Sequence, residues 1–106
     1  MKSYSLIASL LIFVAAPALA DDYVLTLRDH QFSPKDLVLP ANEKVKLTIR
    51  NEDSVSTEFE SSDLNREKVI QANSEVTLFV GPLNPGTYNY FDDFRRDTTK
   101  GTFTVK

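Results

Sequence analysis

Two short segments of the chain each carry a pair of acidic side chains, the groups best suited to hold a cation. Glu58 and Glu60 flank an aromatic residue in the first segment, and Asp92 and Asp93 stand together in the second. Glu67 follows a few residues after the first segment. Carboxylate oxygens favour hard cations, or Fe and Mn ions, over Cu(I). We therefore take these residues as candidate ligands for Fe²⁺ or Fe³⁺.

A second interpretation of the same residues needs no metal. Carboxylates that are brought together repel one another until a cation neutralises them. Basic side chains nearby in the sequence could supply that charge, namely Arg66, Lys68, Arg95 and Arg96. The acidic residues would then be solvated loop charges, and both interpretations remain open at this point.

His30 is the only histidine of the chain. It is a candidate as a lone metal ligand, because a neutral imidazole binds Fe, Cu and Zn ions. It follows Asp29 and precedes Phe32, so it also suits the turn between two strands. A single His without another His or Cys nearby is more often structural.

The absence of sulfur ligands excludes several kinds of chemistry. The chain has no Cys, and its only Met is Met1. Blue copper requires two His and one Cys, usually with an axial Met, so we expect no type 1 copper. A Ser-His-Asp triad needs a His placed as the base, and no G-x-S-x-G motif surrounds any Ser. We expect a protein that is not an enzyme and whose stability depends on packing without disulfides.

Aromatic and basic residues meet near the C-terminal end. Phe91 and Phe94 alternate with acidic residues there, and Arg95 and Arg96 follow directly. These four residues are candidates for a docking surface, in which an exposed ring meets a partner and the arginines attract acidic groups. The alternative interpretation is that the rings belong to the core.

The first twenty residues have the pattern of an export signal. Lys2 precedes the apolar run from Leu6 to Ala16, which is too short to span a membrane, and Ala18 to Ala20 forms a small-x-small cleavage site. We expect residues 1–20 to be removed and residues 21–106 to form one domain that does not span a membrane. The full chain has a formal charge of −3, and loss of Lys2 makes the mature domain more negative. An acidic domain is not expected to bind nucleic acid.

Short runs of alternating apolar residues, separated by turn residues, predict an all-β fold. The clearest runs are 44–50, with Val45, Leu47 and Ile49 on one face, and 75–80. Further extended segments are expected at 23–28, 31–39, 55–60, 68–71, 87–91 and 102–105, and one helical turn is possible in the irregular segment 61–67. About eight strands at this spacing predict a Greek-key β-sandwich.

Three sequence segments resemble the cupredoxin-like superfamily, and the resemblance covers nearly all of residues 22–106. They are His30 to Pro40, Lys46 to Asp53, and Gly81 to Tyr88 with the aromatic pair that follows. In a copper-binding member, the first His would fall near Thr57, the Cys at Asp92, the second His at Arg95 and the axial Met near 98–100. All of these positions differ here, so the resemblance implies the fold without its copper. It also implies that the segments after Phe59 and Phe91 meet at one end of the sandwich.

A narrower resemblance involves four segments: 58–64, 66–70, 81–83 and 91–94. They are similar to an exported cupredoxin-like protein that accompanies bacterial ferrous-iron uptake systems. The resemblance implies a periplasmic accessory protein of iron transport, which binds iron weakly through its carboxylates or docks on the uptake complex. Its expected partners are an inner-membrane iron permease complex or the periplasmic metal-binding protein of that system. The alternative is a metal-free β-sandwich that serves as a protein-interaction module.

Overall fold

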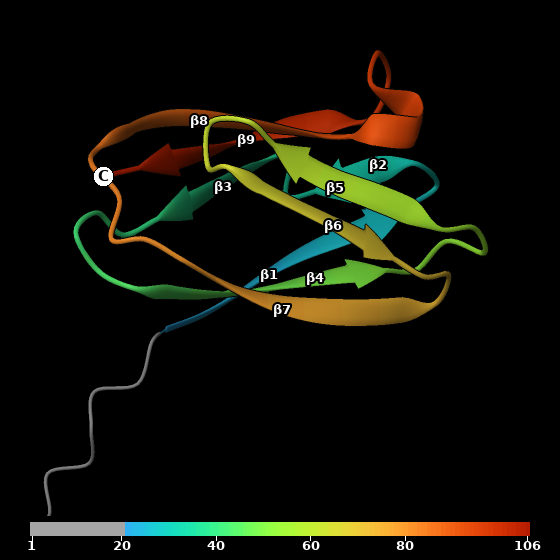
Figure 1. The fold of residues 1–106 in the computed structure, drawn as a ribbon, viewed down its shortest axis with the longest axis horizontal. Helices are drawn as coiled ribbons and strands as arrows, with labels where there is room; N and C mark the ends of the chain where they lie inside the picture. Colours follow the sequence, from blue (N-terminus) through green and yellow to red (C-terminus); the bar gives the residue numbers. More distant parts are fainter. Residues whose placement is uncertain (1–20) are drawn as a thin grey trace, which may run out of the picture.

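The structure is a computed structural model that describes residues 21–106, and the predicted signal peptide at 1–20 lies outside the described residues. Two β-sheets pack face to face (Figure 1). In chain order the elements are β1 (Asp21–Arg28), β2 (Gln31–Ser33), β3 (Asp36–Leu39), β4 (Val45–Asn51), β5 (Thr57–Ser61), β6 (Arg66–Ile70), β7 (Ser74–Val80), β8 (Gly86–Asp92), the 3₁₀-helix η1 (Asp93–Arg95) and β9 (Lys100–Val105). Within this described part, no helix has the length and apolar character needed to cross a bilayer.

Both sheets are mixed. One sheet has four strands in the order β2-β1-β4-β7, and the other has five in the order β3-β9-β8-β5-β6. The pairs β1·β4 and β3·β9 are parallel, and the remaining pairs are antiparallel. The predicted all-β sandwich is therefore confirmed.

Strand alternation determines which side chains form the core. Along β4, Val45, Leu47 and Ile49 are buried while the residues between them are half-buried, as the alternating pattern predicts. Inward-facing residues of both sheets join in one cluster, to which the five-stranded sheet contributes Phe59, Tyr90 and other buried side chains. Each sheet therefore buries one face against the other.

An aromatic group lies at the centre of this core. The Tyr90 ring is 4.9 Å from that of Phe32, which it meets edge-on, and 4.5 Å from that of Phe103. Phe59 completes the group, with its ring centroid 5.5 Å from Tyr90. These contacts tie β5, β8 and β9 of one sheet to β2 of the other, so the strands that carry the candidate ligands have a rigid support.

Two local predictions differ from the structure. The segment 31–39, expected as one extended unit, divides into β2 and β3, which pair in different sheets, so residues 21–106 form nine strands. Pro34 lies at the crossing, where it has no backbone N–H to give to either sheet. Within 61–67, the ends belong to β5 and β6, and residues 62–65 form a turn in which the Asn65 N–H donates to the Ser62 carbonyl at 3.1 Å, and not a helical turn. The helical turn of the described chain lies at η1, directly after β8.

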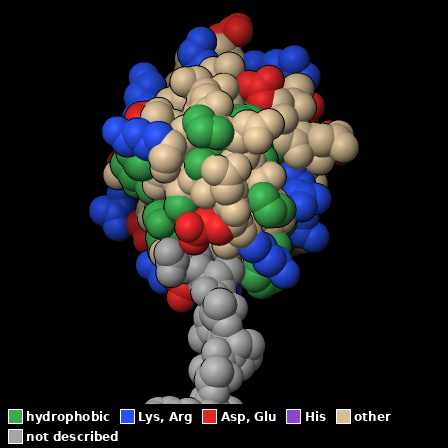
Figure 2. All heavy atoms as spheres, turned by 90° about the vertical axis from the view of Figure 1, so that its left-hand side faces the viewer, with side chains coloured by type: hydrophobic (Ala, Val, Ile, Leu, Met, Phe, Trp, Pro, Cys, Tyr) green, Lys and Arg blue, Asp and Glu red, His purple; other side chains and the backbone are tan. Residues whose placement is uncertain are grey.

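The two ends of the sandwich differ in character. One end carries η1 together with the β1–β2 turn and the β4–β5 connection (Figure 1), and we call it the η1 end. Figure 2 shows the opposite end, where hydrophobic and acidic side chains are scattered and basic side chains lie mainly around the rim. The candidate ligands lie at the η1 end.

Candidate metal site

The outer face of β5 presents two carboxylates because strand residues alternate between faces. Glu58 and Glu60 are half-buried on the outer side, while Thr57, Phe59 and Ser61 between and beside them are buried. The strand is anchored where it begins, since the buried Asn51 at the end of β4 donates through Nδ2 to the carbonyl of Val55 at 2.8 Å. The sequence thus holds both glutamates on a well-supported strand.

The third carboxylate arrives from β8 and η1. Strand β8 pairs with β5 so that Phe91 lies opposite Glu60 and Asp92 opposite Phe59. The chain then turns into η1, whose first residue is Asp93. As a result, oxygens of Glu58, Glu60 and Asp93 all lie within 4.8 Å of one another. We call these three residues the acidic cluster, and their meeting agrees with the expected approach of the two acidic segments.

The electrostatics of the acidic cluster favour a positive ligand. The pKa of Glu58 is raised above 4.5, chiefly because the carboxyl is withdrawn from water. A hydrogen bond with Asp93 and the negative charges of Glu67, Asp93 and Glu60 raise this pKa further. Glu67 acts from across the strand pair, where it lies opposite Glu60. A cation in this position would remove the repulsion that a bound proton otherwise relieves.

Arg96 partly neutralises the acidic cluster. Its guanidinium donates to Asp93 Oδ1 at 2.6 Å and lies 4.9 Å from the centre of the Phe91 ring. The Arg96 side chain is 62% exposed, so the pair with Asp93 is screened by water. Asp93 therefore remains available to a cation at the cost of a weak surface ion pair.

Asp92 is directed away from the acidic cluster, into the protein. It is fully buried, and its Oδ1 accepts from the backbone N–H groups of Glu58 at 3.1 Å and Phe94 at 2.9 Å. Arg95 Nη1 donates to Oδ2 at 3.0 Å. These contacts join β5, β8 and η1. Asp92 thus serves as the N-cap of η1 and as the acidic partner of Arg95.

His30 also lies apart from the acidic cluster. It occupies the β1–β2 turn with Asp29, and both residues have positive φ angles. Asp53 accepts from both backbone N–H groups of this turn, at 2.6 Å from Asp29 and 3.0 Å from His30. The His30 Nδ1 atom is 3.3 Å from Asp53 Oδ2, and its carbonyl accepts from Thr99 Oγ1 at 2.8 Å. The geometry agrees with the turn interpretation of His30.

The two candidate docking rings differ in exposure. Phe94 is 54% exposed on η1, whereas Phe91 is half-buried beneath the Arg96 guanidinium. Of the two arginines, Arg95 is held by Asp92 and Arg96 by Asp93. Phe94 is therefore the ring of this group that is most accessible to another molecule.

The two ion pairs at η1 are a feature that the sequence analysis missed. Asp92 with Arg95 and Asp93 with Arg96 are each three residues apart, the spacing that places side chains together on a helical turn. That repeated spacing was the available signal for a helical turn here. The segment was instead interpreted as a loop, with Arg95 and Arg96 as general counter-charges and without these specific pairs.

Comparison with known proteins identifies the family. Residues 3–105 match the family model of the cupredoxin-like domain. The chain belongs to the cupredoxin-like family. It is 40% identical over 81 residues to an uncharacterized protein of Rickettsia prowazekii (strain Madrid E), which corresponds to 76% of this chain and 65% of that protein. The chain thus spans less than two thirds of the length of this relative.

Solved structures share the cupredoxin-like fold at low sequence identity. Auracyanin B superposes with a TM-score of 0.71 at 19% identity, over 88% of this chain and 94% of auracyanin B. Auracyanin A, a blue copper protein of Chloroflexus aurantiacus, has a TM-score of 0.69 at 12% identity, over 83% of this chain and all of auracyanin A. The metal-binding domain of the Cu(I)-exporting P-type ATPase CopA of Streptococcus pneumoniae D39 has a TM-score of 0.68 at 14% identity, over 80% and 84% of the two chains. At these identities the similarity supports the fold.

The cupredoxin-like domain of this chain does not fit type 1 copper. Where the resemblance places copper ligands, the structure has Thr57, Asp92 and Arg95. The Thr57 hydroxyl is buried without a hydrogen-bond partner among residues 21–106, and a hydroxyl is a poor ligand for copper. The oxygens of Asp92 already accept three hydrogen bonds, and a guanidinium 3.0 Å away would repel a metal cation. An internal ion pair thus stands where the resemblance places two of the copper ligands.

Proposed function

We propose that this protein is an exported, periplasmic accessory component of bacterial ferrous-iron uptake, which binds Fe²⁺ or Fe³⁺ transiently at the acidic cluster. The observation that carries the metal-binding part of this proposal is the meeting of Glu58, Glu60 and Asp93, whose oxygens lie within 4.8 Å of one another. Export and the association with iron uptake are supported by the signal pattern and the sequence resemblance. Oxygens around one divalent cation stand about 2.0–2.6 Å from it, so two ligands on opposite sides are roughly 4–5 Å apart. The spacing of the acidic cluster therefore suits a single ion.

The open surroundings of the acidic cluster favour transient binding. Its three residues are half-buried, and Arg96 competes for Asp93 from an exposed position. A carrier that passes a metal to another protein must release it, and a shallow site with an internal competitor makes release easier. Phe94, exposed beside the acidic cluster on η1, offers a contact for the permease complex or its periplasmic metal-binding protein.

Iron-dependent stabilisation of the mature domain tests the proposal. A metal that binds only the folded state raises the free energy of unfolding by about 1.4 kcal/mol when free metal is tenfold above its Kd. For a domain of this size, that corresponds to a rise in Tm of roughly 6–11 °C. The titration is made with Fe²⁺ under anaerobic conditions and with Fe³⁺, and it is repeated with Cu²⁺ and Mn²⁺.

Matched variants distinguish the site from general charge effects. The double variant Glu60→Gln/Asp93→Asn should lose the iron-dependent shift. Glu43→Gln/Glu75→Gln removes the same charge from exposed residues outside the acidic cluster and should retain it. Equal shifts in both variants would exclude this site. If none of these metals shifted Tm, the alternative of a metal-free interaction module would be favoured.

A further inference from the structure

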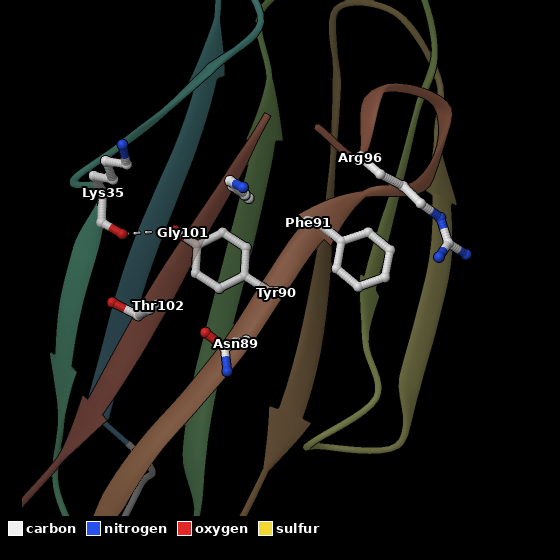
Figure 3. Close-up of a pocket in the computed structure, with 8 residues that line it drawn as sticks. Lys35, Asn89, Tyr90, Phe91, Arg96, Gly101 and Thr102 are labelled. Carbon is white, nitrogen blue, oxygen red and sulfur yellow. Dashed lines mark hydrogen bonds between the residues drawn. The ribbon is translucent and has the colours of Figure 1, made fainter. Parts of the chain in front are cut away.

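A pocket on the five-stranded sheet is lined by none of the three residues of the acidic cluster. It has a volume of about 540 Å³ and opens over β8 and β9, beside the loop that leads into β3 (Figure 3). Its size falls within the range of small-molecule sites, roughly 300–1,000 Å³. The residues that line it include three cations, Lys35, Lys100 and Arg96. An excess of positive charge in one concave place predicts an anionic ligand.

Two of the three cations lack a partner. Within the part of the chain that the structure describes, no ion pair involves Lys35 or Lys100. Both residues are exposed, and Lys100 lies opposite Phe91 in the β8–β9 pair. Their ammonium groups are therefore available to a ligand, although the whole chain carries a negative charge.

Two neutral polar residues of the pocket, Thr102 and Asn89, already have carboxylate partners, and the Tyr90 hydroxyl donates to the Lys35 carbonyl. Thr102 Oγ1 donates to Asp36 Oδ1 at 2.5 Å, and the Asn89 backbone N–H donates to Asp63 Oδ2 at 2.7 Å, with Asn89 Nδ2 at 3.2 Å from the same oxygen. Asp36 and Asp63 are thus held at the margins of the pocket by these donors. The unused hydrogen-bonding capacity of the pocket belongs to the lysines.

The Phe91 ring supplies the accessible apolar surface of the pocket. It is half-buried, and Figure 3 shows it between the Arg96 guanidinium and the side of the pocket formed by Lys35. Tyr90 also lines the pocket, but it is buried in the core and leaves the contact with a ligand to Phe91. An inorganic ion would fill little of this volume and would gain nothing from the Phe91 ring, whereas a ligand with a short carbon body can contact that ring while its charged ends reach the cations.

We propose that this pocket binds a small organic polycarboxylate, with Lys35 and Lys100 as its anchoring cations and the Phe91 ring against its carbon body. Arg96 is the third cation and stands between the pocket and the acidic cluster, because it lines the pocket and also donates to Asp93. Loss of the Asp93 charge releases Arg96 to the anion. Anion binding does not require metal binding, so either can be present without the other.

Calorimetric titration of the metal-free mature domain tests this assignment. The probes are citrate, succinate, acetate and inorganic phosphate at low ionic strength. Affinity is expected to rise from acetate to succinate to citrate, because each added carboxylate gains a cation. Phosphate should bind at least tenfold more weakly than citrate, since it has no carbon body. If phosphate bound as tightly as citrate, the pocket would attract anions by charge alone, and the proposal would be overturned.

Variants locate the site. Lys35→Gln/Lys100→Gln should weaken citrate binding at least tenfold, while Lys46→Gln/Lys68→Gln removes the same charge outside the pocket and should change it less than threefold. Asp93→Asn should strengthen citrate binding severalfold because Arg96 is released, although the same variant is expected to impair the iron site. Equal losses in the two lysine pairs, or no detectable citrate binding by the wild-type domain, would refute the proposal. Citrate binding without an iron-dependent shift would leave the pocket established and remove only the metal function.

Discussion

Replacing Arg95 with Met should destabilise this protein more than the corresponding change at Arg96, the arginine of the neighbouring ion pair. Asp92 is fully buried, and Arg95 is the cation that donates to it. In Arg95→Met, the carboxylate keeps two backbone N–H donors but loses its positive partner. An uncompensated charge inside a protein is costly because water no longer solvates it.

The expected magnitude follows from the exposure of the two partners. Removing one partner of a fully buried pair costs about 3–5 kcal/mol. The Arg95 side chain retains 29% exposure, so water screens part of the interaction, and we expect a loss of about 2–3 kcal/mol. In a domain of this size, the corresponding fall in Tm is roughly 8–24 °C.

Urea and thermal unfolding of matched variants measure this effect. Arg96→Met is the control, because it breaks the neighbouring pair, whose side chains are 62% and 28% exposed, and should cost no more than about 1 kcal/mol. Adding Asp92→Asn to Arg95→Met should recover part of the loss, since it removes the unpaired charge. The reasoning is refuted if Arg95→Met lowers the free energy of unfolding no more than Arg96→Met does. It is also refuted if Asp92→Asn lowers the free energy of unfolding as much in the Arg95→Met background as it does in the wild type.

Three further changes have expected outcomes. Glu58→Gln should raise Tm near neutral pH, because withdrawal from water, more than its charged neighbours, raises the pKa of the Glu58 carboxyl, and wild-type stability falls as pH rises through the raised pKa. Urea unfolding at several pH values should show a free energy of unfolding that varies less with pH in the variant. Gly101→Ala should cost about 1–3 kcal/mol, because a Cβ there meets the Tyr90 hydroxyl and the backbone carbonyl of Lys35. Adding Tyr90→Phe removes only the hydroxyl contact and should recover part of the loss in thermal unfolding. Thr102→Val should destabilise the protein at neutral pH only, because the hydrogen bond from Thr102, with that from Thr104, lowers the pKa of Asp36, and the stability gained from the ionised carboxylate is lost as pH falls through the lowered pKa. Equal destabilisation in acid would contradict this prediction.

Local patterns in the sequence were sufficient to predict most of the strands. The alternation in 44–50 and 75–80 identified the inward faces of β4 and β7, because a strand displays side chains with a period of two whatever it pairs with. The break between β2 and β3 was less accessible. Pro34 limits pairing in either sheet, but only the arrangement of two sheets explains why the chain crosses from one to the other there.

Part of the candidate site could also be predicted. Glu58 and Glu60 share a face by strand alternation, and their approach to Asp93 was expected from the family resemblance. The sequence analysis treated Asp92 and Asp93 together, although alternation along β8 turns Asp92 inward with Tyr90 and leaves Asp93 on the other side. The cationic pocket was also missed, since Lys35 and Lys100 are distant in the sequence and each resembles an ordinary surface lysine.

Residue types and the period of two along a strand were enough to predict the all-β class, the lack of a Cys ligand and the inward faces of the clearest strands. The same alternation along β8 turns Asp92 inward together with Tyr90. The partners that each carboxylate meets came from the tertiary structure, because the pairing of β5 with β8 places Asp92 opposite Phe59 and brings Asp93 close to Glu58 and Glu60. These contacts join residues far apart in the chain, and a local pattern does not specify them.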